Sequence, residues 1–247
     1  MVHSAVAGLG DQGELHKRVD VRHTALAAGA IVVLLIAARL SYRWLVGERR
    51  VPPILLALLL LALATVPLVY VPGLGAAAGG RHRWVRIGPV GFQPSELVQL
   101  AMLVFLAGWL TREKENPRTF RTFLLSLGVI VVCAAAVVRE DFGMASLICV
   151  TGLAVLFLAG IPWTWLTAVT LPAVGAALEF IHMGGYLKAR WDAMVDPWDA
   201  SNPAAYHARQ SLLAVMNGGY FGRGPGHGMV KRGYLPEGHT DFIFSII

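Results

Sequence analysis

Residues 119–138 read TFRTFLLSLGVIVVCAAAVV, an apolar run that contains a single charged residue, Arg121. About 20 residues are needed to cross the hydrocarbon core of a bilayer, and this run has that length. Lipid offers no partners to backbone N–H and C=O groups, so a run of this kind is expected to form a helix. The stretch therefore predicts a membrane-spanning helix.

The same pattern recurs along the chain between bunches of charged residues. We predict six spans and the start of a seventh, at residues 24–46, 52–73, 94–111, 119–138, 143–160, 161–183 and 242–247. Of the 247 residues, 56% are hydrophobic and only 15% are charged, whereas a soluble domain carries about 25% charged residues. The expected fold is therefore an all-α, polytopic transmembrane helical bundle rather than a water-soluble domain.

Three polar segments separate or precede the spans. Residues 1–23 are polar and lack the short apolar core and cleavage site of a signal peptide. Residues 73–93 form a loop rich in arginine and glycine, and residues 184–238 form a long polar loop. Loops of that length in compact proteins are usually functional. We treat residues 1–247 as a single membrane domain.

The lysines and arginines of the long loop have two interpretations. Counted naively, the positive-inside rule places this loop in the cytoplasm, but long loops contribute little to orientation. Basic residues are also expected where a loop binds an anionic ligand. Composition does not choose between the two.

Three carboxylates near the ends of predicted spans are candidates for chemistry, and each has a structural alternative. Glu96 either serves a polar site, because charges at membrane depth are costly, or meets the positive end of a helix dipole. Asp141 either caps the following helix or faces a cavity. Asp241 lies where the long loop becomes apolar, and it is either a first-turn stabiliser or a general base.

Other residues give weaker signals. The glycine-rich stretch 218–228 either cradles phosphate through its backbone N–H groups or is a plain flexible loop. Cys133 and Cys149 lie within apolar runs and are expected to be packing residues. No metal site is predicted from the spacing of side chains.

Several motifs occur in order from about residue 80 to the end of the chain. They are Arg83-Trp84, Phe92-Gln93-Pro94-Ser95-Glu96, Asp141-Phe142-Gly143, Asp196-Pro197-Trp198-Asp199, Tyr206, Gln210-Ser211, Gly218-Gly219 and Leu235-Pro236-Glu237-Gly238-His239-Thr240-Asp241-Phe242-Ile243-Phe244. Their order and spacing resemble those of the SEDS proteins (shape, elongation, division and sporulation). This resemblance is more specific than any single motif.

The resemblance implies a peptidoglycan glycosyltransferase of the bacterial cell membrane. Such an enzyme joins lipid II units into glycan strands at the outer face of the membrane, for cell division or elongation. Asp241 would act as the general base in a displacement that inverts the donor sugar and releases undecaprenyl diphosphate. Positive side chains, or a divalent cation such as Mg²⁺ or Mn²⁺, would stabilise the leaving group. The long loop would then face outwards.

The resemblance also implies which residues contact the substrate and which molecules are partners. The substrate-binding residues would be Arg83, Glu96, Asp141, Arg190, Arg209, Gln210, Arg223, His239 and Thr240. The partners would be lipid II, the growing glycan strand and a class B penicillin-binding protein. Two alternatives stay open, a non-catalytic scaffold that activates a penicillin-binding protein and a lipid II flippase.

Three departures from the family pattern affect these expectations. Gln99 replaces a common lysine, so a neutral hydrogen bond to Glu96, another partner for it or a protonated Glu96 is expected in place of an ion pair. Glu140 replaces the usual proline before Asp141. The chain also has fewer predicted spans than family members usually have, both before residue 73 and after Asp241, so we expect it to be truncated.

Overall fold

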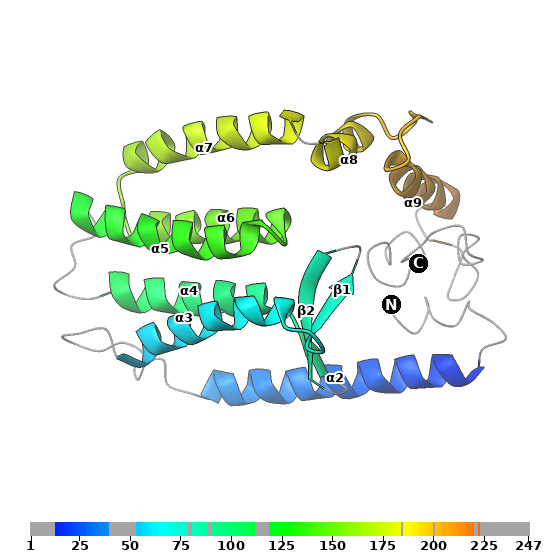
Figure 1. Ribbon diagram of the computed structural model, residues 1–247, viewed down its shortest axis with the longest axis horizontal. Coiled ribbons are helices and arrows are strands. Elements are labelled where there is room, and N and C mark those ends of the chain that lie inside the picture. Colours follow the sequence, from blue (N-terminus) through cyan, green and yellow to red (C-terminus); the bar gives the residue numbers. More distant parts are fainter. Residues whose placement is uncertain are drawn as a thin grey trace. The chain divides into compact units, whose positions relative to one another are not determined.

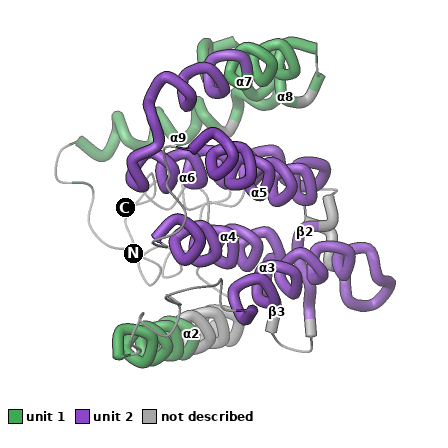
Figure 2. The backbone as a smooth tube through the Cα atoms, turned by 90° about the vertical axis from the view of Figure 1, so that its left-hand side faces the viewer, with its two compact units in different colours: residues 1–40, 173–247 green, residues 41–172 purple. Residues whose placement is uncertain are grey.

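The computed structural model describes residues 13–39, 53–78, 81–87, 90–111, 119–183, 185–199, 201–219 and 222. The chain divides into two compact units, residues 41–172 and residues 1–40 together with 173–247 (Figure 2). The boundary falls at Pro172, inside helix α7 (Trp163–Met183). The assignment of a single membrane domain stays a prediction, and each unit is described by itself.

Four helices build the core of the 41–172 unit. They are α3 (Pro53–Thr65), α4 (Pro94–Leu110), α5 (Phe120–Val138) and α6 (Phe142–Leu158) (Figure 1). Helix α4 contacts the other three, and α5 packs along α6. The side chains between the helices are apolar, and the most deeply buried include Leu55, Met102, Ile130, Ile148 and Leu156.

Gly152 of α6 allows close packing between α5 and α6. A β-carbon at this position would lie 2.7 Å from the side chain of Ile130 on α5. Small residues are enriched where helices approach closely in membranes. Glycine inside a helix costs about 0.5–1 kcal/mol relative to alanine, so the close approach explains its use here.

A small antiparallel sheet lies between α3 and α4 in the sequence, at one end of the helices (Figure 1). Its strands are β1 (Gly75–Ala78), β2 (Arg81–Ile87) and β3 (Val90–Phe92), in the order β1-β2-β3. Val85 of β2 is fully buried and lies opposite Gly75 of β1 and Phe92 of β3. Residues 73–93 were predicted from the sequence to form a loop, and the prediction missed this sheet. The strands are short and glycine-flanked, and such strands give only a weak periodic signal.

Helices occupy the six predicted spans as far as the structure describes them. Three segments are long and apolar enough to cross a bilayer, Pro53–Tyr70, Phe120–Val138 and Trp163–Met183. Three shorter apolar helices lie at Thr24–Arg39, Pro94–Leu110 and Phe142–Leu158. The prediction of a polytopic, mainly helical membrane protein is therefore confirmed. The start of the seventh span, at residues 242–247, lies outside the described residues.

Two predicted boundaries need correction. Helix α2 (Gly13–Arg39) begins inside the segment that was predicted to be a polar terminus before the first span. Helix α3 passes into a short 3-10 helix, η2 (Val66–Tyr70), where Pro67 cannot donate a backbone hydrogen bond. The second predicted span is therefore one continuous helical segment that tightens before residue 71.

The remaining unit contains two helices that were predicted as loop, α8 (Gly185–Val195) and α9 (Ala205–Gly218). The turn between them is held by side chains that bond to nearby backbone. The Asp196 carboxylate accepts from the Trp198 N–H, and Asn202 Nδ2 donates to the Ala189 carbonyl at 2.7 Å. Hydrogen bonds from the hydroxyl and N–H of Ser201 hold the pKa of Asp199 below its ordinary value. The Asp-Pro-Trp-Asp motif thus builds the turn that joins α8 to α9.

Candidate functional site

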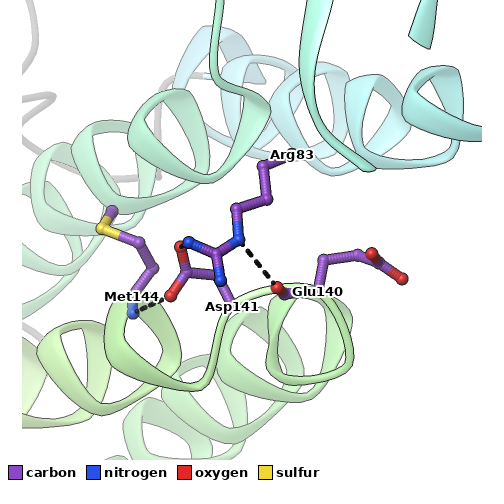
Figure 3. A network of polar contacts seen from close by, with 4 residues as sticks. All are labelled: Arg83, Glu140, Asp141 and Met144. Carbon is purple, nitrogen blue, oxygen red and sulfur yellow. Dashed lines mark hydrogen bonds and ion pairs between the residues drawn. The ribbon is translucent and has the colours of Figure 1, made fainter. Parts of the chain in front are cut away.

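Arg83 on β2 reaches the turn between α5 and α6. Its Nε donates to the main-chain carbonyl of Glu140 at 3.2 Å, and its Nη1 lies 3.3 Å from Asp141 Oδ2 (Figure 3). The Arg83 side chain is 31% exposed and that of Asp141 only 15% exposed. The pair is therefore partly shielded from water, where opposite charges attract more strongly than at a fully solvated surface.

Asp141 is also the N-cap of α6. Its backbone is extended, and its Oδ1 accepts from the Met144 N–H at 3.0 Å (Figure 3). One carboxylate oxygen thus satisfies a free N–H at the helix start while the other faces Arg83. The cap interpretation of Asp141 is confirmed. The residue also lines a small pocket, and its role at a substrate site stays a prediction.

Glu140 receives a second contact from the other side of the turn. The Tyr70 hydroxyl, at the end of η2, donates to the Glu140 carboxylate. The main chain and the side chain of Glu140 are therefore held by two different residues, Arg83 and Tyr70. Sequence reasoning noted Glu140 only as a departure from the family pattern and did not single out Tyr70.

A small pocket lies beside these contacts. Its lining residues are Val66, Val69, Arg83, Gln93, Pro94, Ser95, Val137, Glu140 and Asp141. Its volume is about 20 Å³, and a single water molecule needs about 10–15 Å³. The pocket therefore has room for a water molecule and not for a sugar ring. It brings the motif residues before α4 next to the motif residue before α6.

Glu96 lies in the first turn of α4, two residues after Pro94, and its side chain is exposed. Within the described part of the chain it has no ion-pair partner. Gln99 does not bond to it, and the Gln99 amide instead donates to Thr151 Oγ1 of α6 at 3.4 Å. A hydrogen bond between Gln99 and Glu96 is not formed.

The comparisons with known proteins agree with this arrangement of motifs. Residues 1–247 match the sequence model of a family described as FTSW_RODA_SPOVE, cell cycle protein. The chain belongs to this FtsW/RodA/SpoVE family. The resemblance to SEDS proteins that the motifs indicated is thereby confirmed.

Two relatives illustrate the similarity within the FtsW/RodA/SpoVE family. A probable peptidoglycan glycosyltransferase FtsW of Legionella pneumophila is 34% identical over 224 residues, which cover 90% of this chain and 55% of that protein. A protein of the same description from Nitrosococcus halophilus is 36% identical, and the match covers 77% of this chain and 49% of the relative. The chain spans about half the length of the curated relatives it matches.

Two solved structures have a similar fold. The rod shape determining protein RodA of Thermus thermophilus is 25% identical, with a TM-score of 0.54 over 86% of this chain and 70% of that one. A chain from a structure titled "Structural coordination of polymerization and crosslinking by a peptidoglycan synthase complex" has a TM-score of 0.63 over 87% of this chain and 61% of that one. At 24% identity, the second likeness supports the fold alone.

Within the 41–172 unit the structure brings some of the family's motif residues together. Arg83 and Asp141 are in contact, and Glu96 follows the pocket residues Gln93 to Ser95 on α4. Arg190 lies on α8, and Arg209 and Gln210 lie on α9, in the other unit. The predicted residues Arg223, His239, Thr240 and Asp241 lie outside the described residues.

The family resemblance implies a divalent cation. In the part of the chain that the structure describes, no group of three or more His, Cys, Asp or Glu side chains is placed to hold a metal ion. Asp141 already has a helix N–H and an arginine as partners. The described acids therefore do not form a cation site by themselves, and a cation requirement stays a prediction.

Proposed function

We propose that this chain forms part of a peptidoglycan glycosyltransferase that polymerises lipid II at the outer face of the bacterial cell membrane. The family membership and the names of the FtsW relatives support this activity. The observation that carries the proposal is the meeting of motif residues from three separate segments, β2, the start of α4 and the α5–α6 turn, around one pocket. The pocket itself is too small for a sugar ring, so these residues are proposed as the framework beside the substrate site rather than as its walls.

The proposed reaction is a single displacement. The 4-hydroxyl oxygen of the acceptor sugar forms a bond to the anomeric carbon of the donor, and the bond from that carbon to the diphosphate breaks. The Asp241 carboxylate takes the hydroxyl proton as general base. Attack from the face opposite the leaving group inverts the anomeric centre, and undecaprenyl diphosphate leaves.

Positive charge is needed where the diphosphate leaves. Arg190, Arg209 and Arg223 are the proposed phosphate contacts, because α8, α9 and the glycine-rich stretch carry them on the proposed outward loop. A divalent cation is the alternative source of charge. The proposed partner is a class B penicillin-binding protein, which would crosslink the new strands.

The experiment is polymerisation of purified lipid II, resolved as glycan strands on a gel, with a class B penicillin-binding protein and Mg²⁺ or Mn²⁺ present. The parent chain is compared with Asp241→Asn and with the control Asp192→Asn, which changes an exposed acid on α8. Polymer is expected from the parent and the control but not from Asp241→Asn. Polymer from all three would reject Asp241 as the base. A folded parent that binds lipid II but makes no polymer would favour the scaffold or flippase alternatives.

A further inference from the structure

Arg83 is the one cation among the described residues that line the pocket, and its printed contacts are both with protein. Two different nitrogens are used, Nε on the Glu140 carbonyl and Nη1 on the Asp141 carboxylate. A diphosphate that took over Nη1 would have to draw it from Asp141. That carboxylate is 15% exposed, and leaving a shielded charge without its partner is costly.

The α5–α6 turn is held by two residues of one continuous segment of chain. Tyr70 contacts the Glu140 side chain from the end of η2, and Arg83 contacts the Glu140 main chain and Asp141 from β2. These contacts join residues that are 70 and 57 positions apart in the sequence. The segment from η2 to β2 therefore fixes where α5 ends and where α6 begins.

The same strand also fixes the start of α4. Val85, two residues after Arg83, is fully buried and pairs with Phe92 of β3. Phe92 precedes Gln93, the N-cap of α4, and Gln93 lines the pocket opposite the α5–α6 turn. A displacement of β2 would thus move the α4 motif relative to Asp141.

We propose that Arg83, with Tyr70, is a positioning residue that clamps β2 to the α5–α6 turn, and that its charge serves Asp141 rather than the diphosphate of the substrate. This Arg83–Tyr70 clamp sets the distance between the motif that carries Glu96 and the motif that carries Asp141. The role in catalysis rests on the proposed function, whereas the clamp itself does not.

The clamp is tested first by stability, with no need for activity. Melting temperatures are measured in detergent for Arg83→Gln, Asp141→Asn and the double variant. Asparagine keeps the helix cap, so Asp141→Asn removes only the charge. Each single variant is expected to melt several degrees lower than the parent. The double variant is expected to melt no lower than the less stable single variant, because both substitutions remove the same Arg83–Asp141 ion pair. Arg86→Gln is the matched control on the same strand, exposed and expected to be neutral.

Kinetics then separate positioning from substrate binding. With lipid II as the varied substrate, Arg83→Gln is expected to lower kcat about tenfold or more, because small misplacements of a site cost that much. Its KM is expected to stay within about twofold of the parent value, since no substrate contact is lost. Tyr70→Phe is expected to shift the same parameter in the same direction by a smaller factor.

Two results would overturn the clamp. Additive losses of melting temperature would show that Arg83 and Asp141 do not stabilise each other. The second result is a large rise in KM for Arg83→Gln at unchanged kcat, while the KM and kcat of Asp141→Asn stay at the parent values. This result would make Arg83 a substrate contact. If the folded parent makes no polymer, the proposed function fails. The clamp is then still decided by the melting temperatures. Non-additive losses in the double variant support it, and additive losses overturn it.

Discussion

The helical core and the polar end of the 41–172 unit are held together by different forces. Between α5 and α6 the contacts are apolar and tight, with Gly152 set against Ile130. At the end where β2 meets the α5–α6 turn, the contacts are a partly shielded ion pair, a helix cap and hydrogen bonds to Glu140. The comparison teaches that stability of the unit should depend more on the first region, and activity more on the second.

The largest expected loss of stability follows from breaking the core. In Gly152→Ala the new β-carbon would lie 2.7 Å from Ile130, so one side chain or one helix must shift. Overpacking of this kind typically costs about 1–3 kcal/mol. Thermal unfolding in detergent measures the loss. Gly128→Ala on α5, where a β-carbon meets nothing within 4 Å, is the matched control and is expected to be neutral or stabilising. Equal melting temperatures for the two variants would contradict the tight α5–α6 contact.

A smaller loss is expected from the hydrogen bond that links α4 to α6. Gln99→Leu removes the amide that donates to Thr151, while the Thr151 hydroxyl keeps its own bond to the Leu147 carbonyl at 2.7 Å. Hydrogen bonds between membrane helices are worth about 0.6 kcal/mol on average. Thr151→Val is expected to cost a similar amount, and the double variant no more than either single change. Additive losses in the same unfolding assay would show that the two side chains act separately.

The smallest expected effect is a small gain of stability, at a buried polar group of the helical core. Ser126 of α5 is 1% exposed, and its hydroxyl has no hydrogen-bond partner among the described residues. A buried polar group without a partner costs about 1–3 kcal/mol. Ser126→Ala is therefore expected to leave the melting temperature unchanged or to raise it slightly. A clear decrease would show that the hydroxyl is bonded in the folded protein.

The sequence predicted the helical core better than the polar end, for a physical reason. Spans such as 119–138 are visible because length and hydropathy alone determine them. The Asp141 cap was also predicted, because a cap bonds to a residue three positions away. The pairing of Arg83 with Asp141 was not predicted from the sequence. It joins segments 58 positions apart through a sheet whose short strands leave little periodic signal.

The long loop shows the same limit. Asp196 and Asp199 were recognised as part of a motif, yet their hydrogen bonds lie within a turn between two helices that the polar sequence did not predict. Helices α8 and α9 have low average hydrophobicity, so no apolar run in the sequence indicated them. Such amphipathic or polar helices depend on tertiary packing more than on local propensity.

The central claim is that the core governs stability and the clamp governs activity, and one paired measurement tests it. Melting temperature and lipid II polymerisation per folded protein are recorded for Arg83→Gln and Gly152→Ala. We predict that Gly152→Ala melts lower yet polymerises close to the parent rate below its transition, whereas Arg83→Gln loses about tenfold or more in rate for a smaller thermal shift. If both variants lose activity only in proportion to their loss of stability, the account of the clamp is contradicted.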